Sequence, residues 1–206
     1  MISKFWEKGI LQPTKFERAI DLFIGFMRKT TESLIPDWFS KPMIRFIKRT
    51  KKNCSIGVEI GVAEGHNSKN ILLMLPVRKL YLVDSYFMSY KEENRIVEYP
   101  ENTYVKAKKR LSKFDDRIIW VFKKSEDAID EIPNNLDFVY IDGNHSYDFV
   151  KKDIENYYPK VRKGGIIGGH DFSGNHIDVS KAVIDFATEK QLKICGRDDD
   201  WWIEKS

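Results

Sequence analysis

Residues 58–68 read VEIGVAEGHNS and mark the point where a predicted strand turns into a helix. Two glycines, Gly61 and Gly65, stand in this turn, where they let the backbone pass close to a ligand. Asn67 or Ser68 is placed to cap the helix that follows. The G-x-x-x-G spacing differs from the G-x-G-x-x-G of pyrophosphate-binding sites, which disfavours a nicotinamide-dependent oxidoreductase. A glycine pair alone also fits an ordinary tight turn. Residues at the ends of the other strands are needed to distinguish such a turn from a ligand-binding one.

From residue 54 onward, short β-rich runs alternate with helical stretches. We predict strands at 55–60, 79–83, 118–122, 138–141 and 165–169, followed by a terminal hairpin of 192–195 and 201–204. Helices between the strands imply βαβ units and a parallel sheet covered on both faces. The expected fold class is α/β: a doubly wound, mostly parallel seven-stranded sheet with a terminal antiparallel hairpin. Such sheets bind ligands beyond the carboxyl ends of their strands.

Charge is unevenly distributed along the 206 residues, which together carry a net charge of +4. Residues 1–53 hold 12 Lys/Arg against 5 Asp/Glu, whereas residues 54–206 hold 23 against 26. The basic part has a helical pattern, and its last helix is expected to turn Met43, Ile44 and Ile47 inward. We therefore predict a basic helical N-terminal arm over 1–53 and a ligand-binding domain over 54–206. The arm is expected to be a cap or a subunit contact, as in a homodimer.

Composition excludes several classes of protein. The 42% hydrophobic and 13% aromatic residues supply enough apolar surface for a core, so the chain is not largely disordered. No apolar run approaches the roughly 20 residues of a membrane-spanning helix, and the N-terminus lacks the pattern of a secretory signal. Two cysteines are too few for a disulfide framework. We expect a protein of the reduced cytoplasm.

Polar residues follow the other predicted strands. Asp84 ends the second strand, 19 residues after Gly65, where a carboxylate can accept hydrogen bonds from ribose hydroxyls. Ser125 follows the third strand, where an adenine ring would lie, although it would also make a good helix cap. Asp142 and Asp171 follow the fourth and fifth strands. These positions predict a nucleoside-binding edge with acidic residues beyond it.

All four histidines lie just beyond predicted strand ends: His66, His145, His170 and His176. Two uses of this pattern are open. Asp142, His170 and Asp171 could ligate a divalent cation such as Mg²⁺ or Mn²⁺. Alternatively, His145 or His170 could serve as a general base near neutral pH without a metal.

In combination, these motifs resemble those of class I S-adenosylmethionine-dependent methyltransferases. The chain is most similar to the short Rossmann-like group that includes macrocin O-methyltransferase-like and cephalosporin hydroxylase-like proteins. The segments that carry the resemblance are 58–65, 82–84, 137–147, 163–171 and 202–205. It covers roughly residues 54–206, leaves the basic arm outside, and implies a Rossmann-like methyltransferase fold.

The resemblance also implies a role for each strand-end residue. Gly61 and Gly65 would flank the methionine part of S-adenosylmethionine, and Glu59 would orient its amino group. Asp84 would hold the ribose hydroxyls and Ser125 would lie near adenine. The expected cofactor-binding set is completed by His66, Ser68 and Asp142.

The cluster of His and Asp residues beyond the strand ends makes Asp142, His145 and His170 the expected catalytic residues. In metal-using relatives, an acidic residue after strand four and an acidic pair after strand five hold the cation. Those positions correspond here to Asp142, His170 and Asp171, so His170 replaces a carboxylate.

The expected activity is O-methylation of a small hydroxylated molecule, such as a sugar or a phenol. The irregular segment 86–102 is expected to be a lid or binding loop. One alternative is an RNA or other nucleic-acid methyltransferase that uses the basic arm, although no Asn-Pro-Pro-aromatic or Pro-Cys signature is present. Another is a non-catalytic module whose arm lies on an anionic membrane surface.

Overall fold

The computed structural model describes residues 41–51, 53–86, 90–92, 95–98 and 100–206. Most of the predicted arm, residues 1–40, lies outside the described residues. Its last part forms helix α3 (Pro42–Thr50), in which Met43, Ile44 and Ile47 are buried as predicted. No helix among the described residues is long and apolar enough to cross a membrane.

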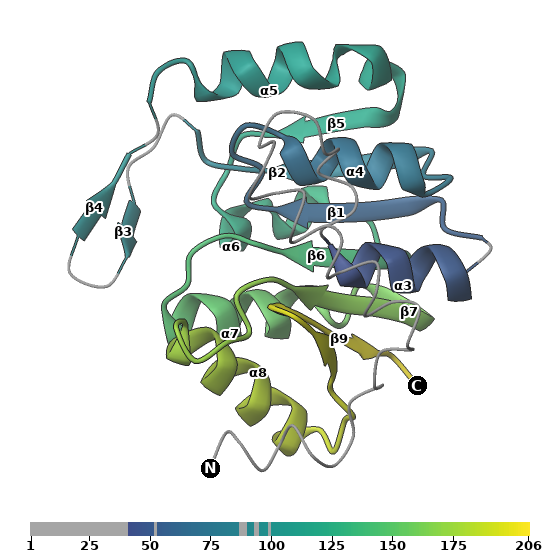
Figure 1. Ribbon diagram of the computed structural model, residues 1–206, viewed down its shortest axis with the longest axis vertical. Helices are drawn as coiled ribbons and strands as arrows, with labels where there is room; N and C mark the ends of the chain where they lie inside the picture. Colours follow the sequence, from purple (N-terminus) through teal and green to yellow (C-terminus); the bar gives the residue numbers. More distant parts are fainter. Residues whose placement is uncertain (1–40, 52, 87–89, 93–94, 99) are drawn as a thin grey trace, which may run out of the picture.

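Seven strands form one sheet in the order β5-β2-β1-β6-β7-β9-β8 (Figure 1). The parallel strands are β1 (Ile56–Ile60), β2 (Lys79–Val83), β5 (Ile118–Val121), β6 (Leu136–Ile141) and β7 (Val161–Gly169). The antiparallel strands are β8 (Cys195–Arg197) and β9 (Asp200–Glu204). The predicted fold class is confirmed. The first strand of the hairpin begins later than predicted, because the Leu192 backbone N–H bonds to the Ala187 carbonyl and closes the preceding helix.

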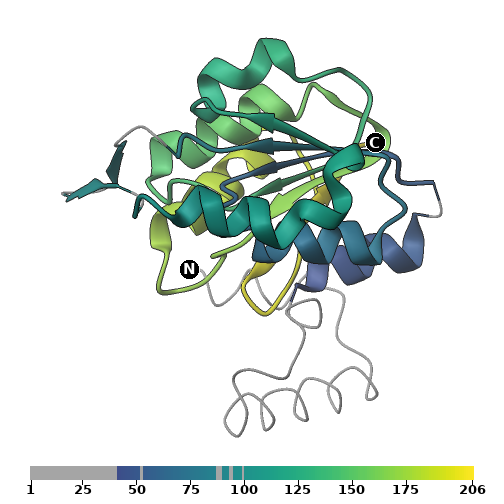
Figure 2. The same cartoon turned by 90° about the horizontal axis from the view of Figure 1, so that it is seen from above.

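Helices cover both faces of the sheet (Figures 1 and 2). On one face lie α3, α4 (His66–Met74) and α5 (Thr103–Leu111), and on the other lie α6 (Ser125–Ala128), α7 (Tyr147–Tyr157) and α8 (Ile177–Glu189). Two short 3-10 turns, η2 (Ser112–Arg117) and η3 (Ile129–Glu131), complete the connections. Alternate residues of β6 point into the two cores: Phe138 and Tyr140 toward α3 and α4, Val139 and Ile141 toward α7 and α8.

The segment 86–102, expected to be irregular, contains a small antiparallel hairpin. Strands β3 (Tyr90–Glu92) and β4 (Arg95–Val97) pair only with each other. In Figure 1 the hairpin projects away from the main sheet. Strands of three residues are too short to show the alternation of apolar and polar residues by which a strand is recognised in a sequence.

Gly168 of β7 is the point where three elements meet most closely. A Cβ atom there would lie 2.2 Å from the Trp201 carbonyl oxygen and 2.7 Å from the Met43 sulfur. The first contact is with backbone, which has little freedom to move. A side chain at this position would push β9 from β7 and lift α3 from the sheet.

Gly168→Ala is therefore expected to destabilise the fold by about 2–3 kcal/mol, the cost of overpacking a rigid core. Gly174→Ala is the matched control, because nothing lies within 4 Å of a Cβ atom there. Urea unfolding followed by tryptophan fluorescence measures both. Equal midpoints for the two variants would contradict the account of β7 packing.

Candidate functional site

The sheet order places the predicted site residues in a row along the carboxyl edge. Ser125 follows β5, Asp84 follows β2, Gly61 follows β1, Asp142 follows β6 and His170 follows β7. Because these five parallel strands are neighbours in that order, the row has a fixed direction. Residues that are scattered along the sequence thus form one continuous edge.

A cavity of about 550 Å³, part of it open to solvent, lies over the first half of this row. Its lining includes Gly61, Asp84 and Ser125 from the predicted cofactor set, together with Gly143 and Asn144 after β6. The other five predicted cofactor residues are not in its lining: Glu59, Gly65, His66, Ser68 and Asp142.

Gly61 is required by a close approach of two backbones. Its φ is +82°, and a Cβ atom there would lie 2.1 Å from the Asp142 carbonyl oxygen. The turn is fixed on both sides, since the Gly61 N–H bonds to the Val83 carbonyl and the Asp142 N–H bonds to the Ile60 carbonyl. The ends of β2, β1 and β6 are thereby held in one plane beneath the cavity.

Asp84 holds the glycine turn as well as lining the cavity. Its Oδ2 accepts hydrogen bonds from the backbone N–H groups of Val62 at 2.7 Å and Ala63 at 3.0 Å. The Tyr86 hydroxyl donates to the Ala63 carbonyl at 2.6 Å, which fixes the same turn from the other side. The hydrogen bond expected between Asp84 and the ribose hydroxyls of the cofactor remains a prediction.

Glu59 is 1% exposed and ties β1 to the first turn of α4. Asn67 donates to its Oε1 at 2.9 Å and the Ser68 hydroxyl donates to its Oε2. The predicted capping role of Asn67 or Ser68 is wrong: α4 has Gly65 as its N-cap and no side-chain cap. Burial raises the pKa of the Glu59 carboxyl to about 8, although the two hydrogen bonds lower it.

The Ser125 end of the cavity contains a buried carboxyl that sequence reasoning missed. Asp153 of α7 is 3% exposed and lines the cavity beside Ser125. Burial raises its pKa to about 7, against the lowering effect of a hydrogen bond with Ser125. The helical periodicity of the sequence could have revealed its burial, because Asp153 occupies the apolar stripe of α7 that includes Val150 and Tyr157.

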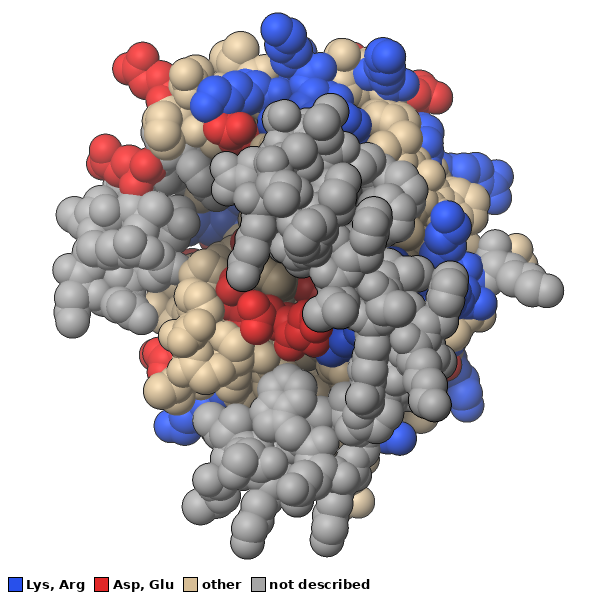
Figure 3. Space-filling model, viewed as in Figure 1, with Lys and Arg blue, Asp and Glu red and all other residues tan. Residues whose placement is uncertain are grey.

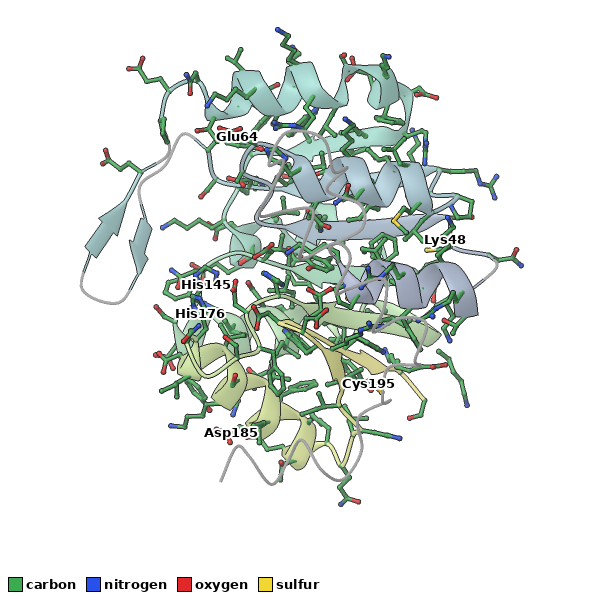
Figure 4. The ribbon with its side chains drawn as sticks, in the orientation of Figure 1. Lys48, Glu64, His145, His176, Asp185 and Cys195 are labelled. Atoms are coloured by element: carbon green, nitrogen blue, oxygen red, sulfur yellow. The ribbon has the colours of Figure 1, made fainter. Side chains whose placement is uncertain are left out.

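At the far end of the row, two histidines flank Asp171. His145 Nε2 lies 2.9 Å from Asp171 Oδ2, and His176 Nε2 lies 3.5 Å from Asp171 Oδ1. The centres of the His145 and His176 rings are 5.0 Å apart, and the two side chains are seen together in Figure 4. Burial favours a higher pKa for Asp171, but His145, His170 and His176 hold this pKa below its ordinary value.

His170 turns away from this group. Its Nδ1 lies 2.8 Å from Oδ1 of Asp200, a fully buried residue of β9. Burial favours a lower pKa for His170, but the hydrogen bond to Asp200 and the negative charges of Asp200 and Asp142 together outweigh it, so the pKa is raised. His66 stands apart at the exposed end of the glycine turn, 3.7 Å from Glu64.

Among the described residues, Asp142, His145 and Asp171 have ligand atoms that all lie within 4.8 Å of one another. This set corrects the geometry expected of Asp142, His170 and Asp171. His145 takes the place of His170, because Asp200 holds the His170 ring toward β9. Carboxylate and imidazole donors together suit a divalent cation.

A lysine that sequence reasoning missed also reaches this end of the row. Lys41 Nζ lies 3.5 Å from Asp142 Oδ2 and 5.5 Å from the centre of the Tyr140 ring. Its position could not be read from the sequence, since 101 residues separate it from Asp142.

Comparison with known proteins identifies a protein family whose model matches this chain. A family described as Methyltransferase domain has a model that matches residues 58–172. The matched segment begins in β1 and ends directly after Asp171, so it contains the glycine turn and the ends of all five parallel strands.

Uncharacterized protein R132 of Acanthamoeba polyphaga mimivirus is 31% identical over 119 residues, which are 56% of this chain and 50% of that protein. The chain thus spans about half the length of the curated relative it matches. Among solved structures, the SAH-bound methyltransferase PaMTH1 of Podospora anserina has a TM-score of 0.62 at 14% identity, covering 96% of this chain and 99% of that one. The O-methyltransferase NovP has a TM-score of 0.60 at 16% identity, covering 79% and 76%. At these identities the likeness shows the fold alone.

The raised pKa of Glu59 predicts a pH-dependent stability. Between the ordinary value of 4.5 and the folded value of about 8, the folded state binds more protons than the unfolded state. The wild-type protein therefore loses stability as pH rises through this window. Glu59→Gln removes that loss, so its melting temperature relative to wild type should rise by about 5 °C between pH 5 and pH 8.

Glu64→Gln is the control for this measurement. The Glu64 carboxyl is at the surface, and its hydrogen bond with Lys106 lowers its pKa, so it does not titrate between pH 5 and pH 8. Thermal unfolding without cofactor gives all the values. A Glu59→Gln advantage that is the same at both pH values would contradict the buried-acid account.

Proposed function

The chain belongs to the methyltransferase domain family, and we propose that it transfers the methyl group of S-adenosylmethionine to a hydroxyl group of a small molecule such as a sugar or a phenol. The family match and the fold support methyl transfer from S-adenosylmethionine. The acceptor and the residues that act on it are our proposal.

The row of strand ends supports a defined direction for the cofactor. Adenine would lie at Ser125, the ribose at Asp84, and the methionine part at the glycine turn of Gly61, in the order of strands β5, β2 and β1. The methyl group would then face the ends of β6 and β7. The acceptor would bind at that end, beside Asp142 and Asp171.

The observation that carries the proposal is the group of proton acceptors at this end: Asp142, His145 and Asp171. In methyl transfer the acceptor oxygen attacks the methyl carbon opposite the sulfur, and the carbon–sulfur bond breaks. A hydroxyl oxygen must lose its proton as this bond forms, and an imidazole can take that proton. Alignment of the two reactants supplies much of the remaining rate.

A divalent cation is a second way to remove the proton. The donors that would hold it are Asp142, His145 and Asp171, and the mixed carboxylate and imidazole set fits such an ion. A bound cation would lower the pKa of a hydroxyl that it contacts. Methyl-transfer assays with and without EDTA distinguish the two ways. Loss of turnover in EDTA that added Mg²⁺ restores would indicate a cation, and unchanged turnover would indicate a histidine base alone.

One observation favours a second acceptor class, nucleic acid. Helices α3, α4 and α5 carry three, one and four Lys/Arg and no Asp/Glu, whereas α6, α7 and α8 carry three Lys/Arg and eight Asp/Glu. In Figure 3, Lys and Arg gather at the top of the view, where α5 lies, and along the right side. A basic face of this kind can hold phosphates.

Transfer of a labelled methyl group from S-adenosylmethionine to a panel of sugars, phenols and RNA tests the proposal. We expect label in the small-molecule fraction, and we expect Asp142→Asn combined with His145→Asn to lower turnover by about 100-fold or more. Asp116→Asn, an exposed residue of η2, is the control and should retain turnover. Full turnover by the double variant would show that the acceptor end is wrongly assigned. Label in RNA alone would replace the small-molecule acceptor by the second class.

A further inference from the structure

Lys41 lies at the boundary between the basic arm and the sheet, and its side chain is only 15% exposed. Its Nζ is 3.5 Å from Asp142 Oδ2, which is longer than a good charge-assisted hydrogen bond. An ammonium group has three donors, and partial burial of its charge is costly without strong partners. Its contacts with the described residues therefore leave this cation with bonding capacity toward the neighbouring cleft.

The start of α3 fixes the position of Lys41. Because Pro42 follows it, the Lys41 backbone is restricted to extended conformations, and its φ and ψ are −107° and 99°. The Met43 N–H donates to buried Asp200 at 2.9 Å, and Met43 and Ile44 are themselves fully buried. The lysine is thus held by a rigid element.

The sheet order shows what lies beside Lys41. Along the carboxyl edge the cofactor would run from Ser125 through Asp84 to Gly61, and the next position in the row is Asp142, the partner of Lys41. A Cβ atom on Gly61 would touch the Asp142 carbonyl, so these two positions are adjacent. The amino-acid end of the cofactor therefore ends next to the Lys41 ammonium.

A cation at this end would complement the negative charge of the ligand. The amino-acid part of S-adenosylmethionine carries a carboxylate as well as an ammonium group. Asp84 lines the path of the cofactor, and Asp142 lies beside Gly61 at its end, so carboxylates face this part of the path. The lysines that line the cavity, Lys123 and Lys124, follow β5 and lie at the opposite, adenine end.

We propose that Lys41 binds the carboxylate of the methionine part of S-adenosylmethionine, so that the last residue before α3 is a cofactor-binding residue. The inference rests on the proposed placement of S-adenosylmethionine, and it is independent of the acceptor. On binding, the ammonium exchanges part of its contact with Asp142 for the cofactor carboxylate, which leaves the Asp142 carboxylate available to the acceptor.

Isothermal titration calorimetry with two ligands tests this role. S-adenosylmethionine and its decarboxylated analogue differ only in the carboxylate. Lys41→Met should weaken binding of S-adenosylmethionine by about 10–100-fold, the usual effect of a lost charge-assisted hydrogen bond. Binding of the analogue should not weaken. Lys48→Met is the matched control, because Lys48 is exposed on the same helix, away from the His145–His176 pair (Figure 4), and should leave both affinities unchanged.

Lys41→Arg is the second variant, since it keeps the charge and should retain affinity for S-adenosylmethionine within a few fold. An equal loss for both ligands in Lys41→Met would overturn the inference, because it would show a general effect on the cleft. An unchanged affinity for S-adenosylmethionine would overturn it as well. If the wild-type protein bound neither ligand, the proposed function itself would fail, and that result is distinct from the other two.

Discussion

A single buried carboxylate, that of Asp200, holds together the parts of the molecule that meet beyond the ends of β6 and β7. It accepts hydrogen bonds from the Met43 backbone and the Tyr140 hydroxyl and contacts the His170 ring, so it links β9 to α3, to β6 and to the residue after β7. A carboxylate without exposure is costly unless its oxygens are satisfied. Its three partners reduce that cost and, at the same time, fix three elements relative to one another.

The turn after β1 follows the same rule, that buried polar groups need hydrogen-bond partners, and here the groups are backbone N–H donors. The turn after β1 has N–H groups that no regular element satisfies, and Asp84 accepts two of them. Glu59 is satisfied in turn by Asn67 and Ser68 from α4. Two acids on neighbouring strands thus shape the glycine turn before any ligand binds. Glu59 and Asp84, which are predicted to bind the cofactor, therefore also have a structural role.

The sequence predicted the features that depend on local patterns. Alternating strands and helices identified the sheet, and its order then brought Ser125, Asp84 and Gly61 to one edge. Sequence patterns could not assign side-chain partners, because those depend on distant packing. His170 is held by Asp200, 30 residues away, so His145 joins Asp142 in its place. Asn67 and Ser68 fit the local rule for a helix cap, yet a buried acid eight or nine residues earlier in the sequence attracts both.

The bond between Met43 and Asp200 spans 157 residues, which gives it a consequence for folding order. Contacts between distant parts of a chain form late, because closing a long loop costs conformational entropy before the contact stabilises it. The strands β1, β2, β5, β6 and β7 can pair through shorter connections, whereas α3 has its backbone partner only after β9 has joined the sheet. Docking of α3 is therefore expected among the last steps of folding, and the carboxyl edge of the sheet is completed only when the two ends of the described chain meet.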